Sequence, residues 1–151
     1  GAKIVGIGGL VNIRQNARKV VFSGSFTSGA LNVACQGDGL KIVEEGRHGK
    51  FVSSIEQICY NARFATQEGR SAVFVTERAV FRLTADGLEL FEIAAGIDLE
   101  KDVLAHMAFR PRVAARVAQM DTRLFKPEPM GIMAELVNAA AHGRRPRRRL
   151  A

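Results

Sequence analysis

The first candidate for chemistry is a glycine-rich cluster near the start of the chain. Residues 6–9 read Gly-Ile-Gly-Gly and follow an apolar stretch. Glycines leave backbone N–H groups unobstructed, so such a loop can hold an anion, a phosphate or a developing oxyanion. The cluster lacks the full dinucleotide-binding fingerprint because Val11 stands at the last glycine position, and no Lys-Ser/Thr pair follows it. Taken alone, these residues favour a tight turn beside a packed strand.

The other residue types that often do chemistry form no recognisable set. His48, His106 and His142 share no spacing with one another or with a carboxylate pair that would indicate a triad or a metal site. We expect each of them to be structural or solvated. Cys35 and Cys59 form no metal-type pair and lie among apolar neighbours, which predicts small buried thiols in a reduced protein.

Two charged residues, Glu77 and Arg78, interrupt an otherwise apolar region. Charges at such a place indicate an ion pair or a turn that connects two strands, and we favour this structural role over a catalytic one. Small residues at positions 23–25 and 28–29 indicate that the backbone turns there or approaches another group closely.

The elements that would position these residues are mostly short strands. β-Branched or alternating sequences predict strands over residues 19–22, 72–76, 79–83 and 88–93, the first of them buried. In the last of these, Glu89 and Glu92 are expected to face water. Residues 31–35 and 40–43 are predicted to form a hairpin closed by an Asp38-Gly39 turn.

Helices are expected over residues 62–68, where Gly69 ends the helix, and after Asp98, which would cap a helix that ends at Pro111. Residues 113–119 and 131–141 are further helical candidates, and residues 51–60 fit either a helix or a strand. Strands and helices mixed without regular alternation predict the α/β class, with a mixed β-sheet and flanking helices.

Length and charge narrow the possible functions. The 151 residues suffice for one domain, and no apolar run approaches the roughly 18 residues of a membrane span. Without the five arginines of the end segment, the net charge of +7 falls to +2. Because no aromatic residues interleave this basic run, we expect no nucleic-acid partner, and the lack of a long apolar run predicts no membrane partner. The arginines concerned are Arg144, Arg145, Arg147, Arg148 and Arg149.

Three strings in this order carry a resemblance to a known family. Residues 6–13 (GIGGLVNI), 75–83 (VTERAVFRL) and 96–104 (GIDLEKDVL) together resemble the C-terminal part of family I CoA-transferases, such as acetate/propionate and 3-oxoacid CoA-transferases. The similarity extends from about Gly6 through Met130, and residues 75–83 are its most specific string. Residues 1–130 are therefore expected to be the C-terminal portion of a CoA-transferase catalytic domain. Residues 131–151 are expected to be a variable, disordered basic tail.

The resemblance also implies a chemistry. Family members move CoA between carboxylic acids through a glutamyl-CoA thioester, which is nucleophilic catalysis by a carboxylate. The family's glutamate lies in an E-x-G turn before the glycine loop, and nothing before Gly6 can supply it. Glu44-Glu45-Gly46 has the same pattern but follows the loop, so we interpret it as a coincidence. Gly8 and Gly9 are the positions implied for the oxyanion and acyl-CoA pocket.

The resulting expectation is a fragment that lines the acyl-CoA pocket and is inactive alone. Coenzyme A would be a co-substrate, without a permanently bound cofactor or a metal, and the full enzyme would be a cytoplasmic homo-oligomer acting on acyl-CoA and carboxylic acids. Short-chain fatty acid or ketone body metabolism is the implied setting. A start at Gly1-Ala2 instead of Met also favours a fragment. The alternative is a stand-alone, non-catalytic binding or interaction module on the same scaffold.

Overall fold

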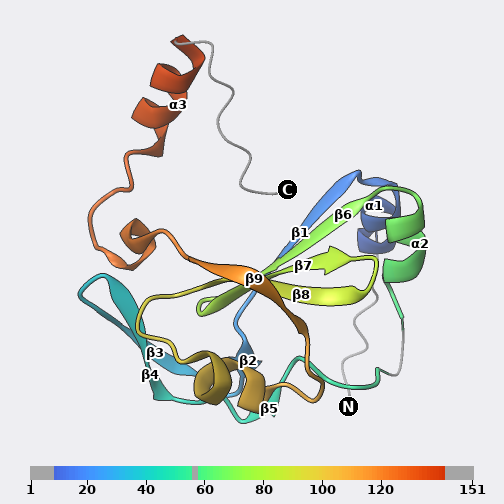
Figure 1. Ribbon diagram of the computed structural model, residues 1–151, viewed down its shortest axis with the longest axis horizontal. Coiled ribbons are helices and arrows are strands. Elements are labelled where there is room, and N and C mark those ends of the chain that lie inside the picture. Colours follow the sequence, from blue (N-terminus) through green and yellow to red (C-terminus); the bar gives the residue numbers. More distant parts are fainter. Residues whose placement is uncertain (1–8, 56–57, 142–151) are drawn as a thin grey trace.

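The computed structural model describes residues 9–55 and 58–141 (Figure 1). Its centre is a five-stranded sheet in the order β1-β6-β7-β8-β9. The outer pairs β1–β6 and β8–β9 are parallel, whereas β6–β7 and β7–β8 are antiparallel, so the predicted mixed α/β sheet is confirmed. The strands are β1 (Lys19–Ser23), β6 (Ser71–Val75), β7 (Ala79–Thr84), β8 (Gly87–Ile93) and β9 (Arg112–Gln119).

Two short helices lie together at the β1 end of the sheet (Figure 1). Helix α1 (Leu10–Asn16), which was not predicted, leads into β1 through two residues only. Helix α2 (Ala62–Gln67) confirms the expected helix there. Its N-cap is Asn61, whose side chain accepts a hydrogen bond from the Phe64 N–H at 3.0 Å. Gly69 ends the helix with a φ of 65°, a conformation that residues with a side chain rarely adopt.

A hairpin of β3 (Asn32–Gln36) and β4 (Gly39–Glu44) is present where predicted, but its turn lies one residue earlier. Gln36 pairs with Gly39, so Gly37 and Asp38 form the two-residue loop, and Gly37 has a φ of 60°. A second small sheet joins β2 (Thr27–Ser28) to β5 (His48–Gly49). Residues 51–55 and 58–60 form no regular element.

The segment after β8 winds less regularly than expected. Asp98 is the predicted N-cap, accepting from the Lys101 N–H at 2.7 Å. The turns it caps are a π-helix, η1 (Leu99–Val103), and a 3₁₀ turn, η2 (Leu104–His106), so the helix ends well before Pro111. A further 3₁₀ turn, η3 (Thr122–Phe125), precedes the predicted helix α3 (Ile132–Ala141), which extends away from the sheet (Figure 1).

The helix expected over residues 113–119 is wrong, because these residues form strand β9 against β8. Alanines and an arginine give this segment little intrinsic β preference. The edge of β8 offers backbone donors and acceptors, and pairing with it satisfies the backbone of the segment. Tertiary context therefore decides its conformation.

Apolar side chains pack against both faces of the central sheet, in two clusters. Phe81 and Leu90, neighbours in the β7–β8 register, are fully buried in one of them. Leu90 and Phe91 are consecutive in β8 and therefore point to opposite faces, so each is buried in a different cluster. The first cluster holds Phe26, Ala79, Phe81, Leu90 and Val103; the second holds Leu40, Val73, Val80, Phe91, Ala94, Met120 and Phe125.

Burial corrects several details of the sequence prediction. Strand β1 is not buried, since Val21 is 60% exposed at the edge of the described sheet. Cys35 is exposed and Cys59 half-buried, so neither is the buried thiol expected. Glu89 is largely shielded because it pairs with Arg82 at 2.6 Å instead of facing water. None of the described helices has the length and apolar character required to cross a membrane.

The hairpin is attached to the sheet by a close backbone approach at Gly39, which generates a test. Leu40 donates its N–H to the Ala95 carbonyl at 2.8 Å, and a Cβ on Gly39 would lie 2.3 Å from that same oxygen. Gly39→Ala is therefore expected to lower the free energy of unfolding by about 1–3 kcal/mol, measured by urea denaturation. The control Gly9→Ala adds a Cβ in open space and should change little; equal losses would contradict the close approach.

Candidate functional site

Only one of the two glycines implied by the resemblance can be placed. Gly8 lies outside the described residues, while Gly9 is exposed directly before α1. The Gly9 carbonyl accepts from the Ile13 N–H at 3.1 Å, and a Cβ added at Gly9 would meet no atom of the described residues within 4 Å. The glycine loop thus ends where the chain turns into a helix, and its role in binding stays a prediction.

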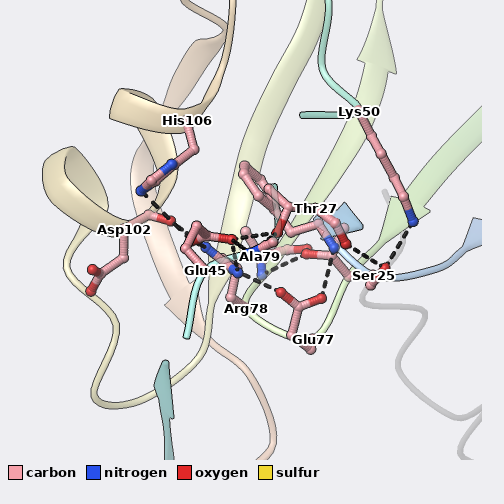
Figure 2. Close-up of polar contacts among 12 residues, drawn as sticks. Ser25, Thr27, Glu45, Lys50, Glu77, Arg78, Ala79, Asp102 and His106 are labelled. Carbon is pink, nitrogen blue, oxygen red and sulfur yellow. Dashed lines mark hydrogen bonds and ion pairs between the residues drawn. The ribbon is translucent and has the colours of Figure 1, made fainter. Parts of the chain in front are cut away.

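A buried arginine, Arg78, is the centre of the most extensive polar cluster in the described structure (Figure 2). Its side chain is 0% exposed. The guanidinium donates to both carboxylate oxygens of Glu45 at 2.6 and 3.0 Å, to Glu77 at 2.7 Å and to the Asp102 carbonyl at 2.9 Å. It also lies 4.7 Å from the centre of the Phe26 ring. We call this set of contacts the Arg78 junction.

The Arg78 junction joins segments that are far apart in the sequence. Glu77 also accepts from the Phe26 N–H at 2.8 Å, which fixes the segment between β1 and β2. Thr76 closes the β6–β7 turn, donating its hydroxyl to the Ala79 carbonyl at 2.7 Å and accepting from the Ala79 N–H at 3.0 Å. The predicted ion pair and connecting turn at Glu77-Arg78 are therefore both present.

Glu45 is the partner of Arg78 that the sequence did not reveal. It follows β4, 33 residues before Arg78, and no local pattern links the two. Burial raises its pKa, but hydrogen bonds from Arg78, the Thr27 hydroxyl and the Gly46 N–H outweigh that effect and lower the pKa to about 2. His106 Nε2 lies 3.6 Å from the same carboxylate. Neighbouring Glu44 is exposed.

A cleft of about 610 Å³ lies beside β1 and β6: it includes residues at the carboxyl ends of these parallel strands and extends to Leu83 and Leu88 near the β7–β8 turn. In open α/β sheets, ligands bind outside the carboxyl ends of parallel strands. Here the small residues Ser23–Ser25 after β1 line the cleft together with Lys50, whose ammonium donates to Ser25 Oγ at 2.8 Å. The sequence indicated a turn or close approach at the small residues, but no pattern in it pointed to Lys50. The apolar walls are Phe22, Phe51, Val52, Ile55, Phe74, Val75, Leu83, Leu88 and Phe109.

In the part of the chain that the structure describes, no three His, Cys, Asp or Glu side chains gather as metal ligands. The two carboxylates of the Arg78 junction, those of Glu45 and Glu77, both accept hydrogen bonds from Arg78. The arrangement is suited to holding loops in place beside the cleft.

The Arg78 junction predicts a large stability effect. Arg78→Met leaves the Glu45 carboxylate without its bidentate partner, so we expect a loss of about 3–5 kcal/mol in the free energy of unfolding. Arg112→Met is the matched control, because Arg112 pairs with Asp86 in an exposed position; exposed pairs contribute little. Urea unfolding of both variants measures the difference, and similar losses would show that Arg78 is not central.

The pKa of Glu45 predicts acid sensitivity. Since its pKa is about 2 in the folded chain against an ordinary 4.5, its contribution to stability is complete above pH 4.5 and is lost as the pH falls toward 2. Glu45→Gln should therefore flatten the decline of unfolding free energy in this pH window, measured by urea unfolding at several pH values. An unchanged slope would mean that other groups cause the decline.

No family model matches the chain, but individual relatives do. It is 40% identical over 131 residues to acetate CoA-transferase YdiF of Escherichia coli K12, and 39% identical over 136 residues to caffeate CoA-transferase of Acetobacterium woodii. Each alignment covers 87% of this chain and 25% of the relative.

The solved structures agree with the sequence comparison. The acyl-CoA transferase YdiF apoenzyme from Escherichia coli O157:H7 matches with a TM-score of 0.82 and 41% identity, over 85% of this chain and 25% of that one. Its thioester complex with CoA matches equally well. The chain spans about a quarter of the length of these relatives. The resemblance to CoA-transferases is therefore confirmed, and in sequence and fold this chain is homologous to about one quarter of such an enzyme.

Proposed function

We propose that the chain is the C-terminal part of an enzyme that transfers CoA between an acyl-CoA and a short-chain carboxylic acid or 3-oxoacid. The observation that supports this most is the match of nearly the whole chain: it is about 40% identical to acetate and caffeate CoA-transferases, and it matches the acyl-CoA transferase YdiF structure with a TM-score of 0.82. The thioester complex with CoA formed by one structural relative supports CoA as the co-substrate.

In this proposal the nucleophilic glutamate belongs to a preceding part of the enzyme. It would form the glutamyl-CoA thioester, which keeps the free energy of the thioester during transfer. The chain would supply one wall of the acyl-CoA pocket, with a backbone N–H of Gly8 or Gly9 stabilising the oxyanion of the attacked acyl group. In the E-x-G look-alike, the glutamate position is Glu44, which is exposed, and the middle residue, Glu45, is held by Arg78.

The assembled enzyme would take acyl-CoA and a carboxylic acid as substrates and form a homo-oligomer in the cytoplasm. Short-chain fatty acid or ketone body metabolism would be its setting. A stand-alone, non-catalytic module is the competing function, and it makes the opposite prediction in the assay below.

A chimera tests the proposal. The matching quarter of the Escherichia coli enzyme is replaced by this chain, and CoA exchange between acetyl-CoA and a second carboxylate is measured. We expect transfer by the chimera and none by the chain alone, because the nucleophile lies elsewhere. A folded but inactive chimera would favour the non-catalytic module, and turnover by the chain alone would show that the nucleophile was misplaced.

Variants of the chimera assign the glycine role. Gly9→Pro should lower kcat by about 10²-fold if the Gly9 N–H is an oxyanion donor, because proline has no backbone N–H and its ring fits the Gly9 φ of −67°. Glu44→Ala is the control and should leave kcat unchanged, because Glu44 is exposed outside the proposed pocket. Loss of activity in Glu44→Ala would overturn the interpretation of the E-x-G pattern as a coincidence.

A further inference from the structure

Helices α1 and α2 lie together at one end of the sheet, and this end of the molecule is basic (Figure 1). Residues 10–19 and 60–71 contain five lysines or arginines and one acid, Glu68, which gives a net charge of +4. The whole chain without the five arginines of its end segment carries only +2, so the remainder is net acidic. Such an asymmetry favours a negatively charged partner at the α1–α2 end.

A pocket of about 340 Å³ lies between the two helices and the start of β6. Arg70, which directly precedes β6, is half-buried there, and its guanidinium lies 5.7 Å from the centre of the Phe64 ring. No described residue of the pocket lining is an aspartate or glutamate, and within residues 9–55 and 58–141 no carboxylate pairs with Arg70. A half-buried cation without an acidic partner favours an anion as its ligand. The lining consists of Gln15, Asn16, Tyr60, Asn61, Phe64, Ala65 and Arg70.

The neutral groups of this pocket supply further hydrogen-bond donors. The Tyr60 hydroxyl is buried and has no hydrogen-bond partner among the described residues. Burial raises the pKa of this phenol, and the charge of Arg70 opposes the rise only in part, so the hydroxyl keeps its proton at neutral pH. The Asn61 Oδ1 accepts from the Phe64 N–H at 3.0 Å, which leaves the Nδ2 group as a donor. A guanidinium, a phenol and an amide together suit a carboxylate, which only accepts.

Large apolar side chains are exposed beside these donors. At least half of each of Ile13, Ile58 and Phe64 is accessible to solvent. Ile13 lies one helical turn before Asn16. Ile58 precedes Tyr60 by two residues, and Phe64 itself lines the pocket. A small anion would leave these apolar side chains in water, whereas a protein segment buries them. An arginine among apolar contacts is typical of the centre of a protein interface.

Building on the proposed function, we propose that the preceding part of the enzyme docks on the α1–α2 end and places an aspartate or glutamate side chain against Arg70 in this pocket. The chain spans about a quarter of its relatives, so a large part of such an enzyme is available to cover this surface. The carboxylate neutralises the guanidinium through two parallel hydrogen bonds. Apolar side chains beside that carboxylate cover Ile13, Ile58 and Phe64.

A matched pair of probes tests the chemistry of the pocket. N-acetylglutamate methylamide and N-acetylglutamine methylamide differ only in a carboxylate against an amide. Both are titrated into the chain and followed by backbone amide shifts. We expect the glutamate probe to bind about tenfold more tightly, because its hydrogen bonds are charge-assisted, with shifts concentrated at Asn16, Tyr60 and Arg70. Arg70→Leu should abolish this preference, and Arg70→Lys should keep part of it.

Arg63→Leu is the control, because Arg63 is an exposed residue of the same helix and lies outside the pocket lining. It should leave the preference for the glutamate probe unchanged. Equal affinities of the two probes, shifts centred elsewhere, or equal effects of Arg70→Leu and Arg63→Leu would overturn the proposal.

The transferase chimera identifies what fills the pocket. The amides of Ala17 and Ala65, which donate to the Ile13 and Asn61 carbonyls, should exchange about tenfold more slowly in the chimera than in the chain alone. Arg70→Leu should reduce this difference, and the glutamate probe should no longer bind because the pocket is filled. A chimera that binds the probe as the chain does would overturn the docking, since the pocket would then serve a free carboxylate.

Transfer activity separates this inference from the function on which it rests. An active chimera whose α1 and α2 amides exchange as in the chain alone would refute the docking and leave the proposed function intact. An inactive chimera with Arg70-dependent protection of these amides would refute the proposed function and not the docking surface.

Discussion

A guanidinium removed from water must be fully hydrogen-bonded and neutralised, and this constraint at Arg78 determines much of the described structure. Its donors point to Glu45, to Glu77 and to the carbonyl of Asp102. Those acceptors come from three separate segments, so none of these segments can move without leaving a buried charge unpaired. Phe26, whose ring centre lies 4.7 Å from the guanidinium, adds a fourth segment.

The same constraint explains why the cleft has a defined shape. The segment between β1 and β2 is held by the Glu77 carboxylate at Phe26, and the segment after β4 by Arg78 at Glu45. Ser25 and Lys50 are close neighbours of these anchored points, and they meet in the lining of the cleft. A site that requires preorganised groups is thus built on loops, but the loops are held by one buried arginine.

The sequence predicted those parts of the fold that depend on local physics. Strands β6, β7 and β8, the Asp98 cap and the Gly69 stop follow from alternation, capping chemistry and glycine conformation. Strand β9 was missed because pairing with β8, a non-local interaction, decides its conformation. The Glu45–Arg78 pair and the Lys50–Ser25 pair could not be predicted for the same reason, since 33 and 25 residues separate their members.

The family resemblance filled a gap that physical reasoning left open. The glycine cluster alone indicated a turn, and only the ordered motifs around it pointed to CoA chemistry, which the relatives support. The most specific of those motifs contains Glu77 and Arg78, which are structural in this chain.

Amide hydrogen exchange in Arg78→Lys tests most directly whether the Arg78 junction holds the walls of the cleft. Lysine keeps the positive charge, but a single ammonium cannot reproduce the bidentate hydrogen bonds to Glu45 together with those to Glu77 and the Asp102 carbonyl. We predict faster exchange at the amides of Phe26 and Gly46, which are bonded to Glu77 and Glu45, and unchanged exchange at Leu40, which is bonded to Ala95. Unchanged protection at Phe26 and Gly46, or an equal loss at Leu40, would contradict the account.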